Sequence, residues 1–331
     1  MKDDATAEKA WPPIPYADWQ TTAAALHLYL QIVGKYRLAR SPWVNHSWHA
    51  TFYVTPRGLT TSLVPDGDGG IEIAFDFVDH VVRGHCASGQ AESVSLEPMS
   101  VADFHGRFVG MITALGGDAT FHGRPNELPD PVPFVEDTAS RPYDADAVYR
   151  FHKALVAVNK VLQDFRTGFR GKVSPVHLFW GSFDLAVTRF SGRRAPLHPG
   201  GIPHLPDDVT QEAYSHEVSS AGFWPGGGPI DDAAFYAYAY PQPEGFADAA
   251  VLPEAASYNA EYGEFVLLLP AGVYELAAEC DGLAPSAHKV VLKGQIAFVG
   301  VDECAHRLIA HRQDGGLHTE AVGDLTGDAG E

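Results

Sequence analysis

Two stretches with the same layout decide the fold: SPWVNHSWHATFYVTPRGL at residues 41–59 and SPVHLFWGSFDLAVTRFSGR at residues 174–193. Each opens with Ser-Pro and continues with a run rich in histidine and aromatic residues. A long amphipathic segment precedes each one, and proline disfavours helix at the residue before it. The repeated helix-to-strand unit predicts two similar halves, and a groove between halves is a common ligand site.

In the first half, apolar residues after Asp18 recur at the spacing of one buried helix face, which predicts a helix that ends at Pro42. Alternation from Trp48 onward then predicts a strand with one apolar and one polar face. The polar face would carry His49, Thr51, Tyr53, Thr55 and Arg57. We expect this face to be polar enough to form a site.

The rest of the first half predicts strands and one more helix. Three segments read as strands: residues 71–82, 91–97 and 118–123. Ser100 with Asp103 resembles a capping box and predicts a helix that stops at Gly116. The proline-rich residues 126–137 mark the boundary between the halves.

The second half begins with Asp144 as a predicted N-cap of a long amphipathic helix. Strands are expected after Ser174 and in YSHEVSSAGFW and AFYAYAYPQP. In the last of these, Tyr236, Tyr238 and Tyr240 share one strand face. Beyond Pro253, short strands separated by glycine and proline predict an extension of β character.

The expected fold class is α+β, with two related helix-on-antiparallel-sheet halves and a short β-rich C-terminal extension. The expected divisions are a disordered N-terminus at residues 1–10, halves at 11–136 and 137–268, the extension at 269–312, and a disordered acidic tail at 313–331.

Composition narrows the classes of function. The net charge of −19 is concentrated in residues 202–331, which hold 21 acidic and 4 basic residues. Such a surface repels nucleic acid and anionic membranes, so we expect neither as a partner and predict a small-molecule ligand. Three cysteines without a C-x-x-C pair, and no secretory signal, predict a cytoplasmic protein. The oligomeric state is left open.

Histidines are the first candidates for chemistry. His46 and His49 form H-x-x-H, but on a strand they face opposite sides, so His49 is the better base or ligand. His49, His216 and Glu217 together match the donor set of a divalent zinc or iron site. Structural, hydrogen-bonded histidines are the competing interpretation.

Asp184 is the acidic candidate, because a carboxylate among apolar residues requires a partner or a shifted pKa. A salt bridge to Arg189, Arg193 or Arg194 is the alternative explanation. The expected catalytic set is His49, Asp184 and His216.

Basic and aromatic residues around the two Ser-Pro units suggest a binding surface for a polar or anionic molecule. The expected substrate-binding residues are Tyr53, Arg57, Trp180, Arg189, Trp224 and Tyr238. Solvated charge and core packing are the alternatives for these side chains.

Four strings resemble a bacterial family grouped as domain of unknown function 5996: WVNHSWHATFYVTPRGLTTS, SPVHLFWGSFDLAVTRFSGR, YSHEVSSAGFWPGGG and AFYAYAYPQPEGF. The resemblance runs from about Trp11 to about Leu267. It implies no activity. From Leu269 onward the β-like sequence departs from the family's helical continuation.

Two functions follow as expectations. The first is an enzyme that acts on a small polar or anionic molecule in a His/Asp/aromatic-lined cleft between the halves, with or without a metal. The second is a non-catalytic module that binds a small ligand or a protein. The enzyme hypothesis requires His49, Asp184 and His216 to converge within hydrogen-bond reach.

Overall fold

The structure, a computed structural model, describes residues 12–269 except 203, 228, 229 and 252, and the backbone of three later strands. These are β12 (Tyr274–Cys280), β13 (Ile296–Phe298) and β14 (His306–Arg312), which form one sheet in the order β12-β14-β13. The expected disordered ends, residues 1–10 and 313–331, lie outside the described residues, as do residues 288–294, one of the short strands predicted beyond Pro253.

The first half contains helix α1, an antiparallel meander of five strands and helix α2. The elements are α1 (Tyr16–Arg40), the 3₁₀ helix η2 (Asn45–Ala50), β1 (Tyr53–Thr55), β2 (Gly58–Val64), β3 (Ile71–Asp76), β4 (Val81–Cys86), β5 (Ala91–Ser95) and α2 (Val101–Ala114). Helix α1 ends just before Pro42, as predicted. The capping box is also confirmed, because the Ser100 side chain accepts the Asp103 N–H and the Asp103 side chain accepts the Ser100 N–H.

The second half contains helix α3 and a six-stranded antiparallel sheet in the order β10-β11-β9-β8-β7-β6. The elements are α3 (Ala145–Thr167), β6 (His177–Phe179), β7 (Asp184–Arg194), α4 (Asp207–Ala213), β8 (His216–Trp224), β9 (Ala233–Tyr240), η3 (Phe246–Asp248), β10 (Ser257–Asn259) and β11 (Glu264–Leu269). Asp144 caps α3 by accepting the N–H of Ala147, as expected.

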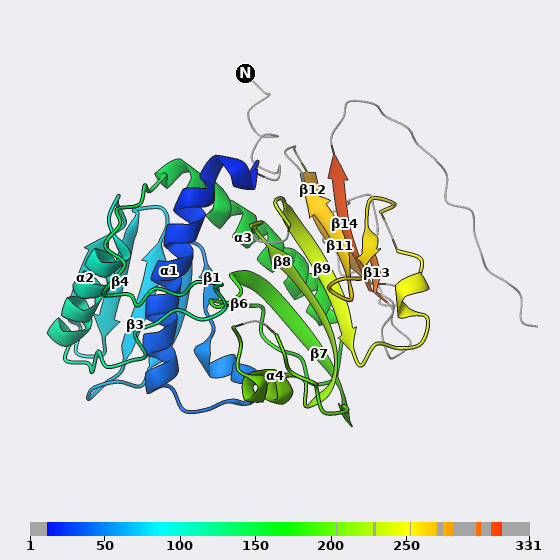
Figure 1. Cartoon of the computed structure of the whole chain (residues 1–331), viewed down its shortest axis with the longest axis horizontal. Helices are drawn as coiled ribbons and strands as arrows, with labels where there is room; N and C mark the ends of the chain where they lie inside the picture. The colour runs from blue at the N-terminus through cyan, green and yellow to red at the C-terminus, as the bar shows by residue number, and fades with distance from the viewer. Residues whose placement is uncertain are drawn as a thin grey trace, which may run out of the picture.

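The two sheets meet edge to edge where β1 approaches β6 (Figure 1). Phe52 and Leu178 exchange two backbone hydrogen bonds there, at 2.9 and 2.8 Å. Buried apolar residues of both sheets and of α1, α2 and α3 form one continuous core. The α+β class is thus confirmed, with one sheet in each predicted half; a division into separate domains stays a prediction.

One sheet face determines where a site can lie. Alternate residues of β7, β8 and β9, such as Leu185, Phe223 and Phe235, are buried in the core. The residues between them point to the opposite face of the six-stranded sheet, where polar groups are concentrated. No helix among the described residues combines the length and hydrophobicity needed to cross a bilayer.

The strand expected from Trp48 is wrong over its first part, since residues 45–50 form η2. His46 and Ser47 adopt left-handed conformations, with φ of 61° and 58°. The N–H of His46 donates to the Glu212 carboxylate at 2.6 Å, a contact from a distant segment that the alternation cannot reveal. His46 and His49 therefore do not lie on opposite faces of a strand.

Two other strand predictions are corrected. Residues 71–82 form two strands, because the Asp76 carboxylate accepts the N–H groups of Val78 and Asp79 and fixes a turn. Residues 118–123 form no strand; the Arg40 guanidinium holds them by donating to the Asp118 side chain and to the carbonyl of residue 120. The sequence interpretation also missed β2 and β14.

Candidate functional site

The three expected catalytic residues do not converge. No hydrogen bond joins His49, Asp184 and His216 to one another in the part of the chain that the structure describes. The ring of His49 lies against Trp43, with centroids 4.8 Å apart, and its Nδ1 atom contacts the backbone of Val44. The condition that the enzyme hypothesis set for these three side chains is not met.

The expected metal donors are also separated. Glu217 forms an ion pair with Arg193 at 2.6 Å and accepts a hydrogen bond from Ser191, which together lower its pKa. His216 lies next to His46, with ring centroids 6.3 Å apart, rather than next to His49. No group of three or more metal-binding side chains is assembled among the described residues.

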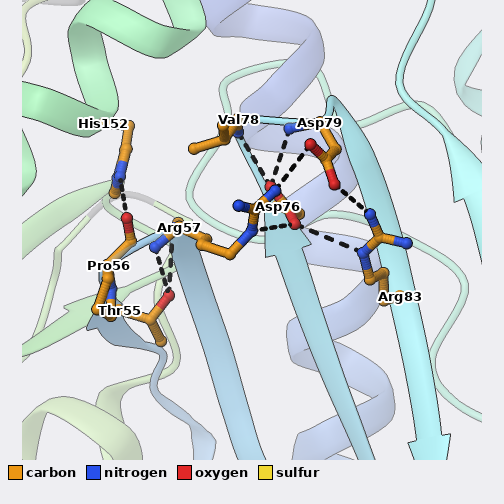
Figure 2. A network of polar contacts seen from close by, with 9 residues as sticks. Thr55, Pro56, Arg57, Asp76, Val78, Asp79, Arg83 and His152 are labelled. Atoms are coloured by element: carbon orange, nitrogen blue, oxygen red, sulfur yellow. Dashed lines mark hydrogen bonds and ion pairs between the residues drawn. The ribbon is translucent and has the colours of Figure 1, made fainter.

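Arg57 belongs to a closed ion-pair network on the five-stranded sheet (Figure 2). Residues of this network line a surface hollow of about 450 Å³. Its Nε donates to Asp76 at 2.7 Å, and Nη2 contacts Asp79 at 2.8 Å. Arg83 bridges the same two carboxylates. Burial alone would raise the pKa of Asp76, but the hydrogen bonds from Arg57 and the turn hold it below its ordinary value. The predicted substrate-binding arginine is therefore balanced by acidic neighbours.

Three other expected substrate-binding residues have structural contacts. Trp180 is buried and donates its indole N–H to the carbonyl of Ala50 at 2.7 Å. The guanidinium of Arg189 lies 3.5 Å over the Phe165 ring, on the core side of the sheet. Tyr53 stacks on His177 with ring centroids 6.5 Å apart. These contacts within the protein explain the positions of the three side chains, and no ligand is needed to explain them.

Asp184 lies in a different environment, at the start of β7 on the polar face of the six-stranded sheet. Its two carboxylate oxygens accept hydrogen bonds from the hydroxyls of Ser182 and Tyr236. The alternative explanation, a salt bridge to Arg189, Arg193 or Arg194, is not among the ion pairs of the described residues. Burial raises the pKa of Asp184, and the two hydroxyls oppose that rise only in part.

The strand register places further polar groups on the same face of the sheet as Asp184. Thr188 pairs with Ser220, and Ser220 pairs with Tyr238 on the next strand. Because Phe265 pairs with Ala237, Glu264 falls opposite Tyr238 on β11. Trp224 lies on this face as well, by alternation along β8. Of the expected binding residues, Tyr238 and Trp224 thus share a face with Asp184.

A glycine makes room for the hydroxyl that reaches Asp184. The Tyr236 ring lies over Gly222, where a Cβ atom would come within 2.2 Å of the phenol oxygen. Glu127 uses a similar gap, because a Cβ atom at Gly181 would come within 1.8 Å of its Oε1 atom. Both glycines therefore let a polar side chain pack directly on the backbone beside Asp184.

We define the carboxylate–tyrosine site as Glu127, Asp184, Tyr214, Tyr236, Tyr238 and Glu264, all of them half-buried. Burial, followed by repulsion from Asp184, raises the pKa of Glu127 to about 7 and that of Glu264 to about 7. Neither Asp184 nor Glu264 forms an ion pair within the described residues. When Asp184 and Glu264 are ionised, no base among the described residues pairs with them.

One cation lies at the border of this site. Lys35 of α1 is buried and donates to the Asn126 side chain at 2.6 Å. Burial lowers its pKa to about 8, and Glu127 opposes that shift. Lys35 offsets part of the charge of Glu127.

Sequence reasoning identified Asp184, Tyr238 and the tyrosine alternation but missed Glu127, Tyr214 and Glu264. Alternation along β11 could have placed Glu264 on the polar face, had the pairing of β11 with β9 been known. Glu127 comes from a loop, and no local pattern indicates that its backbone N–H binds the carbonyl of His204.

Comparison with known proteins gives a family but no activity. No curated protein and no solved structure matches the chain. A family model described as "Family of unknown function (DUF5996)" matches residues 11–278, most of the chain. The chain therefore belongs to the DUF5996 family of unknown function.

Proposed function

We propose that this protein binds a small polar molecule with a cationic group, such as an amine or a guanidinium, at the carboxylate–tyrosine site. The observation that carries the proposal is the set of partners of Asp184, which among the described residues are two hydroxyls and no base. A carboxylate that is partly withdrawn from water is costly unless it is paired, so a ligand cation would supply the missing partner.

Aromatic rings support the same ligand class. Tyr236 and Tyr238 stack with centroids 6.1 Å apart, and Tyr214 lies 6.0 Å from Tyr238. Ring faces attract cations, and phenol oxygens accept hydrogen bonds from ammonium groups. The site thus offers both charge and π-surface to a cation.

An anionic ligand, the expectation from the arginines, is less well supported. Arg57 and Arg193 bind carboxylates of the protein, and Arg37 donates to the backbone carbonyls of His49 and Thr51. The groups near Asp184 are acidic instead. Cytoplasmic location and bacterial origin stay predictions from the sequence.

Catalysis on the bound molecule is the second candidate. Glu127 and Glu264, with pKa values of about 7, would exchange protons near neutral pH, as general acids and bases do. Product analysis after incubation with a bound amine separates an enzyme from a binding protein.

A calorimetric titration with putrescine and agmatine tests the proposal, with butane-1,4-diol as the uncharged counterpart of putrescine. We expect heat of binding with at least one amine and none with the diol. Asp184→Asn should weaken amine binding at least about tenfold, the scale of one lost charged hydrogen bond. Asp79→Asn, which alters the network of Figure 2, is the matched control. Equal affinity in wild type and Asp184→Asn, or no binding of either amine, would refute the proposal.

A further inference from the structure

Strand β5 forms an open edge of the five-stranded sheet. It pairs with β4 on one side and with no other strand among the described residues. The opposite edge of this sheet, β1, meets β6 of the six-stranded sheet, whose own outer edge is the three-residue strand β10. Of the two outer edges of the joined sheets, β5 is therefore the longer, with five residues.

The hydrogen-bond register shows which backbone groups of β5 are open. The N–H of Leu96, just after β5, donates to the carbonyl of His80 at 2.8 Å. Because bonded residues alternate along an antiparallel ladder, the even-numbered residues of β5 also bond to β4. The N–H and C=O groups of Ala91, Ser93 and Ser95 therefore point away from the sheet, and no hydrogen bond holds them among the described residues.

These open groups are complementary to themselves about Ser93. A two-fold axis perpendicular to the sheet would run two copies of β5 antiparallel, with Ser93 opposite Ser93 and Ala91 opposite Ser95. Each such pair exchanges two backbone hydrogen bonds, so every open group of the strand finds a partner. The neighbouring two-fold register in one direction would place Glu92 opposite Glu92, where like charges repel, and the one in the other direction would pair Ala91 with a residue beyond the strand.

A hollow between β5 and α2 gives the contact complementary charge. It has a volume of about 380 Å³ and is lined by Val94 of β5 and Arg107 of α2, among others. In the register centred on Ser93, Glu92 of the second copy lies opposite Val94 and shares its sheet face. Glu92 has no ion pair among the described residues, while Arg107 contacts Glu97 at 2.6 Å and has further N–H groups to donate.

The distribution of charge also favours contact at this edge. The acidic excess lies in residues 202–331, whereas residues 1–201 hold 21 acidic and 19 basic residues. Figure 1 shows α2 and β4, the neighbours of β5, at the opposite end of the molecule from β9 and β11. Two copies joined through β5 would hold their acidic parts far apart, so screened repulsion between those parts is weak.

We infer that two copies of this protein associate through β5 and thereby join their five-stranded sheets into one continuous antiparallel sheet. The contact through one short strand is small beside the roughly 1,200–2,000 Å² that a stable interface buries, so the dimer should dissociate on dilution. The carboxylate–tyrosine site lies on the other sheet, so this association does not depend on the proposed ligand.

Sedimentation velocity of the full chain, from low micromolar to several hundred micromolar, tests the dimer. Wild type should pass from monomer to dimer as the concentration rises. Glu92→Arg reverses the charge that faces Arg107 of the second copy, and the two-fold axis repeats the change. The dissociation constant should therefore rise at least about tenfold. Adding Arg107→Glu to Glu92→Arg should restore the dimer, because the two charges are exchanged.

Glu261→Arg is the matched control. It makes the same change of charge at an exposed residue between β10 and β11, at the other end of the joined sheets, and should dimerise as wild type does. A monomer at every concentration would overturn the inference. A dimer that Glu92→Arg weakens no more than Glu261→Arg does would also overturn it, because the contact would then lie elsewhere.

Amide hydrogen exchange measured by NMR locates the contact without any variant. The amides of Ser93 and Ser95 are open in one copy, whereas the amide of Val94 faces β4. Exchange at Ser93 and Ser95 should slow about tenfold where nine chains in ten are dimeric, because only the monomer exchanges there. The rate at Val94 should change much less. Protection of Ser93 and Ser95 in a monomer at every concentration would mean that another segment of the same chain covers the edge, and would overturn the dimer.

Discussion

Two groups of carboxylates in this protein have opposite kinds of partners. On the five-stranded sheet, Asp76 and Asp79 are bridged by Arg57 and Arg83, and Asp76 also fixes the turn between β3 and β4. On the six-stranded sheet, Asp184 is bound by two hydroxyls. The partners of the first group give it a structural role in the fold. The partners of Asp184 do not give it such a role.

The pKa directions express this difference. Asp76 is held below its ordinary pKa despite its burial, because donors favour the charged form. Glu127 and Glu264 are raised to about 7, because burial and the neighbouring Asp184 disfavour the charged form. Charge that lowers stability when the site is empty is typical of groups kept for a ligand or for proton transfer.

The largest expected effect comes from filling the gap under Tyr236. Gly222→Ala places a methyl group within 2.2 Å of the Tyr236 phenol, so the ring must move away from Asp184. We expect unfolding free energy to fall by about 1–3 kcal/mol, the usual cost of overpacking. Urea denaturation measures it.

Gly110→Ala in α2 is the matched control, because no atom lies within 4 Å of the added methyl group. Alanine favours helix over glycine, so stability should rise by about 0.5–1 kcal/mol. A loss of the same size in both variants would mean that Tyr236 has no special constraint.

A smaller effect should appear in the pH dependence of stability. The raised pKa of Glu264 means that the folded state binds its proton more tightly than the unfolded state, so stability rises as the pH falls from about 7 toward 4.5. Glu264→Gln should remove this contribution, which is of the order of 1 kcal/mol for a half-exposed group.

Denaturation at several pH values between 4.5 and 7 checks the prediction against Glu97→Gln. Glu97 is an exposed partner of Arg107, and its replacement should leave the slope unchanged. An unchanged slope in Glu264→Gln would show that Glu264 is ionised normally.

The smallest effect is expected from Arg57→Gln. Arg57 was a predicted substrate-binding residue, but its guanidinium is occupied by Asp76 and Asp79. Affinity for putrescine should change less than about twofold, within ordinary variation for a distant surface substitution. A loss comparable to that of Asp184→Asn would place the ligand on the five-stranded sheet.

Much of the fold could be predicted because local patterns determine it. The helices α1 and α3, the capping box at Ser100 and the tyrosine alternation on β9 all follow from spacing and caps. The segment at His46 could not be predicted, since its left-handed backbone depends on Glu212, which is distant in the sequence. Its alternating residues favour a strand that tertiary contacts override.

The site was predictable only in part, for the same reason. Asp184 and Tyr238 were identified from their own strands, but their partners are set by the pairing of β7, β8, β9 and β11. His49 and His216 were grouped into one site because of their residue type. Residue type gives no information about the distance between two side chains. The donor set of a metal site is common in sequences, whereas its geometry is rare.

The central claim is that Asp184 is kept for a ligand and Asp76 for the fold, and a paired denaturation experiment tests it directly. In Asp76→Asn, Arg57 would lie against either an amide N–H or an uncharged amide oxygen. Arginine can only donate hydrogen bonds, so it cannot adapt to the amide N–H. In Asp184→Asn, the new amide would lie against two hydroxyls, and a hydroxyl can either donate or accept a hydrogen bond. We predict that Asp76→Asn lowers the unfolding free energy by about 1–3 kcal/mol, while Asp184→Asn leaves it unchanged or raises it. An equal loss in Asp184→Asn would contradict the account.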